Sequence, residues 1–467
     1  MNSKFDVLLS SNSRYKLLIY QTLQEKRESS TAIVELKQQM KLSDFKFNNL
    51  IDELQQDLAE TESLMNVSDK YLSIEHFSYH DYQTLQLLYF KQSIAVDLLI
   101  KVGLFESITI SEFAEYNFLS SSSVYNVRSR VNEVLKTYGL TFKNSQIIGN
   151  EKSIRSFYFQ ILFNYYGGIE SPFSESIKKT VQSYIHEIEK SFTKDMTIVQ
   201  RIKLEIFLGV QLYRIKNNCY IAENGIVEKQ VEVEAFFKQY IPRYSSSKIP
   251  SSEGKVLYLF LVLNCYIKSD IRLKPTAIGL QLIEYLNERI QIAKMDSYED
   301  ILYNVDLVSQ SWVHFQLATS TFVYAADFKV FEKTSPKLKS LIYDFVSQLD
   351  VIDGHKIAEI EKLHLYYEYM INLLAVEEIQ LLERQINIFV DFSSGKSYDQ
   401  FIRNHIGYHG YINLNLMSEL NEDTDIYVSD FSNTNVKCLQ VIWKGSPTDV
   451  EWEELVNAIA FLRNQTE

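Results

Sequence analysis

The spacing of hydrophobic residues near the start of the chain predicts three short helices. Residues 14–27 are amphipathic, and Ser30 or Thr31 can cap a second helix over 32–40. Asp44 can cap a third helix over 45–58, in which the apolar residues keep helical spacing. A tight turn before the third helix completes a helix-turn-helix pattern, and residues 61–75 are suited to a small β-wing.

The same order of elements returns between residues 76 and 150. Residues 81–92 and 93–103 read as two helices, 109–117 as a capped third, and 120–139 as a longer fourth that ends at Gly139, a residue typical of helix C-termini. Residues 141–150 then read as a short β-ribbon. Helix, turn, longer helix and ribbon is the order of a winged helix-turn-helix domain.

The remaining chain changes character near residue 385. Before that point, long helical periodicities such as 177–192, 198–217 and 356–385 predict two helical bundles of roughly 110 residues each, with no competing strand pattern. After it, strand-like runs alternate with helices, which predicts a small α/β domain with a mostly parallel sheet. The predicted fold is therefore multidomain and mainly α, with divisions at 1–75, 76–160, 161–275, 276–384 and 385–467.

Composition narrows the class of protein. The chain has 467 residues, is 46% hydrophobic and contains only 14 Gly and 6 Pro, which favours large helical cores over disorder. Cys219, Cys265 and Cys438 lie far apart and form no metal-binding spacing, so we expect reduced cysteines, no metal and no cofactor. Because no stretch approaches the roughly 18 apolar residues of a membrane span, we expect a soluble cytoplasmic protein.

The net charge of -13 argues against nucleic acid as a partner, but the acidic residues are unevenly distributed. Residues 1–160 contain 17 Lys+Arg and 19 Asp+Glu, a balance of -2, which leaves -11 for the rest. Between Asn117 and Asn150 the sign reverses. That segment has four cations (Arg128, Arg130, Lys136 and Lys143) and one acid, Glu133.

The fourth helix of the second pattern has the face of a DNA-reading helix. At 100° per residue, one side is apolar (Val124, Val127, Val131, Val134, Leu135 and Tyr138), and the other is polar (Ser122, Tyr125, Asn126, Ser129, Asn132 and Lys136). Arg128 and Arg130 flank the apolar stripe. Short hydrogen-bonding side chains suit base edges, and cations at the borders suit phosphates. An ordinary solvated helix face is the alternative.

The first helix-turn-helix is the weaker candidate. Its three lysines (Lys37, Lys41 and Lys46) are outnumbered by six acids (Glu35, Asp44, Asp52, Glu53, Asp57 and Glu60). We therefore expect the second element to dominate DNA affinity, and alanine at Arg128 and Arg130 to weaken DNA binding tenfold or more.

The order of domains resembles the Mga and AtxA family of Gram-positive virulence regulators. The local matches are residues 120–163, which include the fourth helix and ribbon, and RIKNN at 214–218. The resemblance implies two helix-turn-helix domains, two regulatory domains of the sugar phosphotransferase system and a terminal enzyme-IIB-like domain that mediates self-association. It also implies promoter DNA as the main partner, the phosphocarrier protein as a transient one, and a homodimer.

Regulatory domains of this type are phosphorylated on histidine, which requires an accessible neutral imidazole. In the orthodox pattern a histidine stands seven residues before the arginine of the RIKN stretch, and here that position is Phe207. The remaining candidates are His314 and His364 in the second bundle and His186 in the first. A packed or surface histidine is the alternative at each position.

Three other patterns are weak. An active enzyme-IIB domain carries its phosphate on a cysteine after the first strand, but residues 392–397 contain none, and Gly395-Lys396-Ser397 lacks the first glycine of a nucleotide-binding loop. Two histidine pairs have metal-like spacing, His76 with His80 beside Asp81, and His405 with His409, but neither has a third ligand fixed by sequence.

These patterns predict a regulator that binds DNA and is not an enzyme. Two alternatives stay open, a helical scaffold protein and a phosphotransferase-system component without DNA binding. Salt-sensitive binding to promoter DNA would separate them from the regulator.

Overall fold

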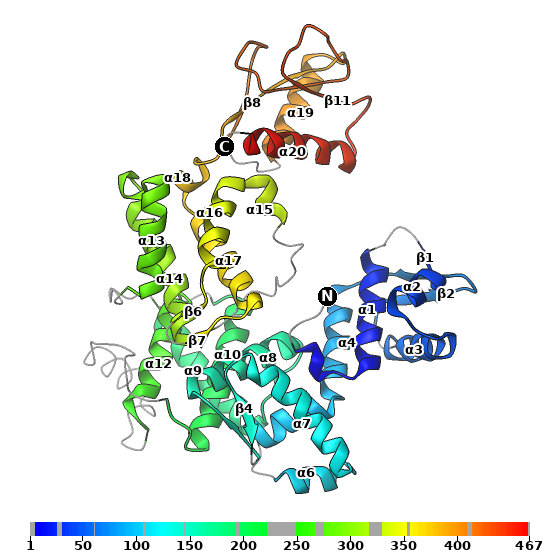
Figure 1. The fold of residues 1–467 in the computed structure, drawn as a ribbon, viewed down its shortest axis with the longest axis vertical. Helices are drawn as coiled ribbons and strands as arrows, with labels where there is room; N and C mark the ends of the chain where they lie inside the picture. The colour runs from blue at the N-terminus through cyan, green and yellow to red at the C-terminus, as the bar shows by residue number, and fades with distance from the viewer. Residues whose placement is uncertain are drawn as a thin grey trace. The chain divides into compact units, whose positions relative to one another are not determined.

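The structure is a computed structural model, and it divides into two compact units, which are described separately. The first unit is Met1–Leu273 with His314–Thr319, and the second is Lys274–Val313 with Ser320–Glu467. Most of the chain is helical (Figure 1). The structure describes residues 5–25, 30–59, 61–105, 109–143, 145–192, 196–221, 249–267, 275–316, 329–352, 355–408 and 413–465.

The first unit opens with two successive groups of helices, each followed by a pair of antiparallel strands. In the first group the strands form a sheet of order β1-β3-β2, and in the second β4 pairs with β5. The first group contains η1 (Asp6–Leu8), α1 (Ser11–Glu25), β1 (Thr31–Ala32), α2 (Ile33–Met40), α3 (Asp44–Asp57), β2 (Leu64–Val67) and β3 (Tyr71–Glu75). The second contains α4 (Tyr79–Lys91), α5 (Ile94–Asp97), η2 (Leu98–Phe105), α6 (Ile110–Tyr116), α7 (Ser121–Lys136), β4 (Thr141–Lys143) and β5 (Gln146–Ile148).

Both predicted ribbons and the predicted helices of these groups are present, but two of the predicted caps are wrong. Thr31 lies in β1 opposite Leu72, so its backbone is held extended and α2 begins without a side-chain cap. The cap of α3 is Ser43, whose hydroxyl accepts a hydrogen bond from the backbone N–H of Lys46, and Asp44 is the first helical residue. Strand pairing with a distant residue is invisible to local spacing.

The rest of the first unit is a group of long helices: α8 (Glu151–Tyr166), α9 (Glu175–Phe192), α10 (Ile198–Lys216) and α12 (Ser251–Leu263). Helix α8 follows directly from the β4–β5 hairpin and is buried over most of its length. It packs against both α10 and α4. Through α8, the hairpin is therefore continuous with the helical core of the unit.

The first described residues pack far from their sequence neighbours. The ring of Phe5 stacks on Tyr138 at 6.4 Å between centroids and meets the edge of Phe157 at 6.0 Å. The hydroxyl of Ser93 donates to the backbone oxygen of Leu8 at 2.5 Å. The segment before α1 is thus part of the core formed by α5, α7 and α8.

The second unit begins with a helical core. Its elements are α13 (Ala277–Ile290), η4 (Ile292–Lys294), α14 (Tyr298–Phe315), α15 (Lys329–Thr334), α16 (Pro336–Ser347), β6 (Val351–Ile352), β7 (His355–Lys356), α17 (Glu359–Leu374) and α18 (Glu377–Gln380). The last two residues of α14 belong to the first unit. Fully buried side chains such as Leu282, Ile342 and Tyr369 hold these helices together.

The continuous helix predicted over 356–385 is interrupted. Residues 355–356 pair with 351–352 as two short antiparallel strands, so α17 begins only at Glu359. A break after Leu374 then separates α17 from α18. The helical spacing of apolar residues continues through both breaks, so periodicity alone predicted one helix where the structure has two.

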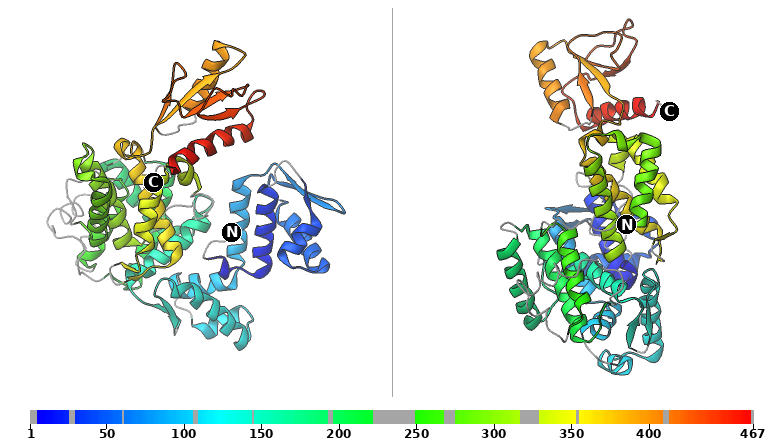
Figure 2. Two further views of the ribbon diagram at one scale, coloured as in Figure 1. Left: turned by 45° about the horizontal axis from the view of Figure 1, so that its top comes forward. Right: turned by 90° about the vertical axis from the view of Figure 1, so that its left-hand side faces the viewer.

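The predicted parallel sheet near the end of the chain is confirmed. Its strands are β8 (Ile386–Asp391), β9 (Leu414–Leu416), β10 (Ile426–Ser429) and β11 (Leu439–Ile442), in the order β11-β10-β8-β9 with every pair parallel. Helices α19 (Lys396–Tyr408) and α20 (Asp449–Asn464) pack on the strands around the buried Trp443 (Figure 2). Among the described residues, no helix is both long and apolar enough to cross a membrane.

Candidate nucleic-acid interface

Helix α7 has the two faces that its sequence predicts. The hydroxyl of Ser120 caps the helix by accepting from the backbone N–H of Ser123 at 3.2 Å. On the inner face Val127, Val131, Val134 and Leu135 are buried, as expected from their spacing. Just beyond the helix Tyr138 is buried and its hydroxyl donates to Gln160 Oε1 of α8 at 2.6 Å. The inner face therefore fixes α7 on the core.

The outer face of α7 is open to solvent. Ser122, Tyr125, Asn126 and Ser129 are exposed, and so is Lys136 in the last turn. Lys143 is exposed on β4. The polar face expected from the sequence is thus available to a ligand, and Figure 1 shows α7 beside α6 near one end of the first unit.

The two arginines that flank the apolar stripe differ. Arg128 is half-buried and forms no ion pair with any described residue. Arg130 is also half-buried, but its guanidinium donates to the backbone oxygen of Leu9 at 3.5 Å. Burial, and then the nearby charge of Arg14, lower the pKa of Arg130. Arg130 thus faces the start of α1, and its proximity to Arg14 could not be predicted from local spacing.

Asn132 does not face solvent as its helical position predicts. Its amide donates to the backbone oxygen of Phe142 at 3.5 Å, and its side-chain oxygen accepts from the Phe142 N–H at 2.7 Å. Phe142 is fully buried in β4. Asn132 therefore holds the hairpin on the helix instead of presenting an amide to a ligand.

The two groups of helices, called the first and second elements below, repeat one local pattern in the turns before α3 and α7. The segments Lys41–Ser43 and Phe118–Ser120 occupy the turns, and in each a left-handed residue with φ of 53° is followed by a leucine and a serine cap. In each element a side-chain amide twelve residues after that cap (43 to 55 and 120 to 132) donates to the hairpin: Gln55 bonds the Met65 oxygen at 3.3 Å, as Asn132 bonds Phe142.

The repeats differ in the charges that they leave available. In the first element Lys37 is 2.8 Å from Asp44 Oδ1 and Lys46 lies over the ring of Tyr15 at 5.0 Å, while Lys41 is exposed. Glu60 lies outside the described residues. In the second element no described residue forms an ion pair with Arg128, Lys136 or Lys143, the cations that remain after Arg130 is set aside. The contrast agrees with the charge balance of the sequence.

A buried network of four charges joins α8 to the helical core. Arg155 donates to both oxygens of Glu253 at 2.6 and 2.9 Å and to Glu151 at 2.9 Å, and Arg214 of the RIKN stretch donates to both oxygens of Glu151 at 2.9 and 2.7 Å. Burial alone raises the pKa of Glu151, but its hydrogen bonds and the charges of Arg214 and Arg155 outweigh burial and hold it below the usual value. The network fixes the helix that follows the hairpin.

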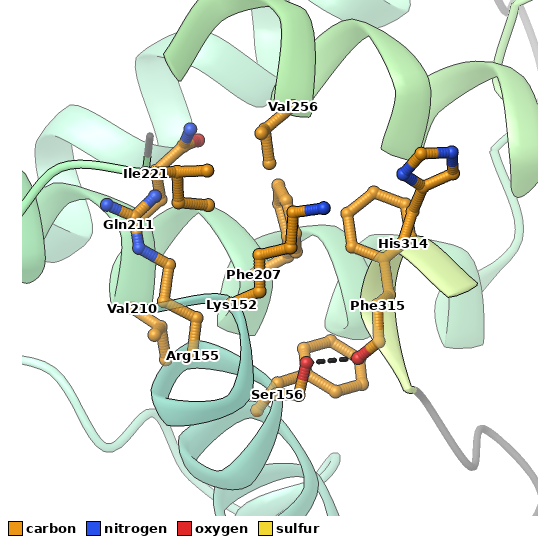
Figure 3. A pocket seen from close by; sticks show the side chains of 11 residues that line it. Lys152, Arg155, Ser156, Phe207, Val210, Gln211, Ile221, Val256, His314 and Phe315 are labelled. Atoms are coloured by element: carbon orange, nitrogen blue, oxygen red, sulfur yellow. Dashed lines mark hydrogen bonds between the residues drawn. The ribbon is translucent and has the colours of Figure 1, made fainter. Parts of the chain in front are cut away.

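A small pocket lies next to this network. Its walls come from α8, α10, α12 and the end of α14. Polar and apolar side chains share the lining, and Figure 3 shows the polar ones: Lys152, Arg155, Ser156, Gln211 and His314. Phe207, at the position of the orthodox phosphorylated histidine, also lines it and stacks on Phe260 at 3.8 Å. No imidazole is present at that position to accept a phosphoryl group.

The three candidate histidines have different environments. His186 is exposed on α9, and His314 is half-buried in the last turn of α14. His364 is buried on α17, with 7% of its surface exposed. Among them, His186 presents its ring most openly to a second protein.

Donors in the loop after β8 form hydrogen bonds with two carboxylates of the same α/β domain. The Ser393 N–H donates to Asp430 Oδ1 at 2.9 Å, its hydroxyl bonds the other oxygen, and the Phe392 N–H donates to Asp399 at 2.7 Å. The bonds from Ser393 lower the pKa of Asp430. Because carboxylates already accept from these loop donors, the loop is poorly suited to a phosphate group.

The two histidine pairs with metal-like spacing have no metal-binding geometry among the described residues. His76 and His80 are exposed, but Asp81 is buried and accepts from Ser63 Oγ at 2.7 Å. His409, the second member of the other pair, lies outside the described residues. Within the described part of the chain, no group of three or more potential ligands is placed to hold a metal ion. Cys219, Cys265 and Cys438 are all free thiols.

Comparison with known proteins places this geometry in a family context. The family model described as the Mga helix-turn-helix domain matches residues 79–162, the span from α4 into α8. A Streptococcus pneumoniae serotype 4 protein named as a trans-acting regulator is 22% identical over 420 residues, covering 80% of this chain and 83% of the relative. The Bacillus anthracis capsule synthesis positive regulator AcpB is 20% identical over 314 residues, covering 61% and 64%.

Proposed function

Since the chain carries an Mga helix-turn-helix domain and its expected resemblance to Mga and AtxA-type regulators is confirmed, we propose that it binds double-stranded promoter DNA as a transcription regulator. In this proposal the second element, a winged helix-turn-helix, provides most of the affinity. The observation that carries it is the outer face of α7, where Ser122, Tyr125, Asn126 and Ser129 are exposed beside cations that no described acid neutralises.

The physical division of labour follows from the exposed groups. Hydroxyl and amide side chains at the N-terminal half of a recognition helix suit base edges in the major groove. Arg128, Lys136 and Lys143 suit phosphates, and binding to phosphates releases counterions, so affinity falls as salt rises. Asn132 acts indirectly, by keeping β4 in place.

The test is binding of the purified chain to a fluorescent duplex from the region upstream of its own reading frame, between 50 and 200 mM salt. We expect alanine at both Arg128 and Arg130 to weaken binding at least tenfold and to lessen its salt dependence, with most of the loss from Arg128, since Arg130 contacts Leu9. Lys179→Ala on α9 is the control, because it removes an exposed cation of the same unit outside the proposed interface. If only substitutions in the first element weakened binding, our ordering of the two elements would be wrong.

For regulation, we propose a link to the sugar phosphotransferase system through the helical regions. His186, His314 and His364 are the candidate acceptors, and phosphate on one of them adds roughly -1.5 to -2 charge, enough to alter helix packing. Incubation with phosphoenolpyruvate and the phosphotransferase components, with each histidine replaced in turn, tests this. A chain that takes up no label would remove phosphocarrier protein as a partner.

For assembly, we propose a homodimer formed through the terminal α/β domain. The loop after β8 contains no cysteine, and its backbone donors already bond carboxylates, which favours an association role over phosphate transfer there. We also propose that the chain activates transcription; AcpB, one relative, is named a positive regulator. Sedimentation of the intact chain and transcription from the upstream promoter used in the binding test measure these two properties separately.

A further inference from the structure

Two aromatic side chains at the N-terminal end of α7 are left almost fully in solvent. Phe118 is 97% exposed and Tyr125 is 73% exposed. An apolar ring that gains nothing from burial in the folded chain is better explained by a ligand than by stability. Phe118 stands just before the Ser120 cap, and Tyr125 belongs to the exposed face of α7.

Phe118 is also held in a conformation that its side chain disfavours. Its φ is +53°, in the left-handed region, where a bulky residue is an outlier and glycine is the usual choice. Two backbone hydrogen bonds lock it there: Phe118 N–H to the Glu115 oxygen at 3.1 Å, and Leu119 N–H to the Ala114 oxygen at 2.8 Å. Strain combined with exposure points from this position to a function.

The internal repeat shows what else can occupy the position. In the first element the matching left-handed residue is Lys41, which is exposed as well. The backbone of the turn is therefore compatible with a long polar side chain, and the aromatic ring is not required for the turn to form. At this turn position a lysine would suit a DNA phosphate, whereas an aromatic ring would suit an apolar group of the DNA bases.

Resting on the proposed function, we infer that Phe118, together with Tyr125, reads the C5-methyl groups of thymines in the major groove. The thymine methyl is the one apolar group that a base pair presents there, and phenylalanine is among the side chains that contact it. Tyr125 lies on the exposed face of α7 with Ser122 and Asn126, and Phe118 stands two residues before the Ser120 cap of the same helix, so one helix end would read hydrogen-bonding edges and methyl groups together.

A thymine-to-uracil exchange tests this directly, since it removes only the methyl group. Two duplexes are compared by fluorescence anisotropy: the upstream duplex of the binding test, and the same duplex with uracil in place of every thymine. We expect the wild-type chain to bind the uracil duplex about fourfold less tightly for each methyl contacted. With Phe118→Gly, the ratio of the two dissociation constants should fall by about that factor.

Folding does not confound this variant, because the ring has almost no packing to lose and glycine suits the φ of the turn. Its melting temperature should match or exceed that of the wild type. Phe118→Lys copies the first element and should also lose methyl discrimination while increasing the dependence of affinity on salt. Ile198→Ala removes a similarly exposed apolar side chain, 79% exposed on α10, and should keep the wild-type ratio.

Three results would overturn the inference. The first is a wild-type chain that binds both duplexes equally. The second is a Phe118→Gly chain that keeps the wild-type ratio. The third is a Phe118→Gly chain with unchanged DNA binding but reduced transcription by purified RNA polymerase, which would assign the ring to a protein contact. A wild-type chain that binds neither duplex would instead overturn the proposed function itself.

Discussion

Asn132 shows how one side chain in the candidate interface serves structure although its spacing suggests recognition. Both ends of its amide bond the backbone of Phe142, which closes the corner between α7 and β4. Ser129, one turn earlier on the same helix, is exposed. Helical spacing gives the direction of a side chain and says nothing about a hairpin that folds back over it.

Replacing Asn132 with alanine removes both bonds and leaves the buried N–H of Phe142 without this acceptor. We expect the free energy of unfolding to fall by about 1–3 kcal/mol, measured by urea denaturation. Ser129→Ala is the matched control and should change stability by less than about 0.5 kcal/mol. Equal effects of the two substitutions would mean that the amide clamp contributes nothing.

Glu151 makes the stability of the first unit depend on pH. Its pKa is held below the usual 4.5 by Arg214 and Arg155, which outweigh the opposing effect of burial. A carboxyl group with a lowered folded pKa stabilises the protein above its unfolded pKa, and this contribution is lost as pH falls through the folded value. The relevant window therefore begins near pH 4.5 and extends below it.

The prediction compares wild type with Glu151→Gln by urea denaturation at several pH values. At pH 7 the variant should be less stable, because it leaves Arg214 buried with a weakened partner. The difference should shrink as pH is lowered below about 4.5, because the unfolded wild-type chain then binds a proton at Glu151 that the folded chain binds only at lower pH. A difference that stays constant down to pH 3 would show that folding does not lower the pKa of Glu151.

At the scale of elements, α10 depends on a glycine. A Cβ added at Gly209 would lie 2.2 Å from two ring atoms of Phe173, which is buried. The helix and the segment before α9 can approach this closely only without a side chain at that position. No sequence pattern predicts this contact, because it joins residues from two separate segments.

Gly209→Ala should therefore destabilise the chain by about 1–3 kcal/mol, through displacement of Phe173. Gly407→Ala in α19 is a useful contrast, since nothing lies within 4 Å of the added Cβ. There alanine should be neutral or stabilising by up to about 1 kcal/mol. Thermal unfolding monitored by circular dichroism measures both, and a Gly209→Ala chain as stable as the wild type would contradict the packing argument.

The sequence predicted elements well where their stability is local. The apolar stripe of α7, both hairpins and the parallel order of the last sheet follow from spacing and turn residues, and all are present. It failed where a distant strand decides the outcome, as at Thr31, which pairs with Leu72 and cannot cap α2. For the same reason the sequence predicted a solvent-facing Asn132. It also did not point to Phe118, whose exposure is evident only in the folded turn.

At the scale of the whole molecule, the two compact units have separate buried cores. Val131 is fully buried in the first unit, and Ile342 is fully buried in the second. Chains with more than one such core often unfold in more than one step. The division into five domains stays a prediction, because compactness resolves two units only.

Differential scanning calorimetry should therefore show two transitions. Val131→Ala should lower the midpoint of one transition, and Ile342→Ala should lower the other, since each leaves a cavity in one core. If each substitution shifted both transitions together by the same amount, the two units would unfold as one cooperative body.

The contacts of Phe5 constrain the order in which parts of the protein can fold during translation. The ribosome releases residues 5–8 long before Tyr138 and Phe157, the rings against which Phe5 packs. During translation this segment must wait, with its apolar side chains uncovered, until α7 and α8 have emerged. Helix α7 thus packs against residues synthesised well before it, and a bulky tag fused ahead of Phe5 would interfere with folding of both groups of helices.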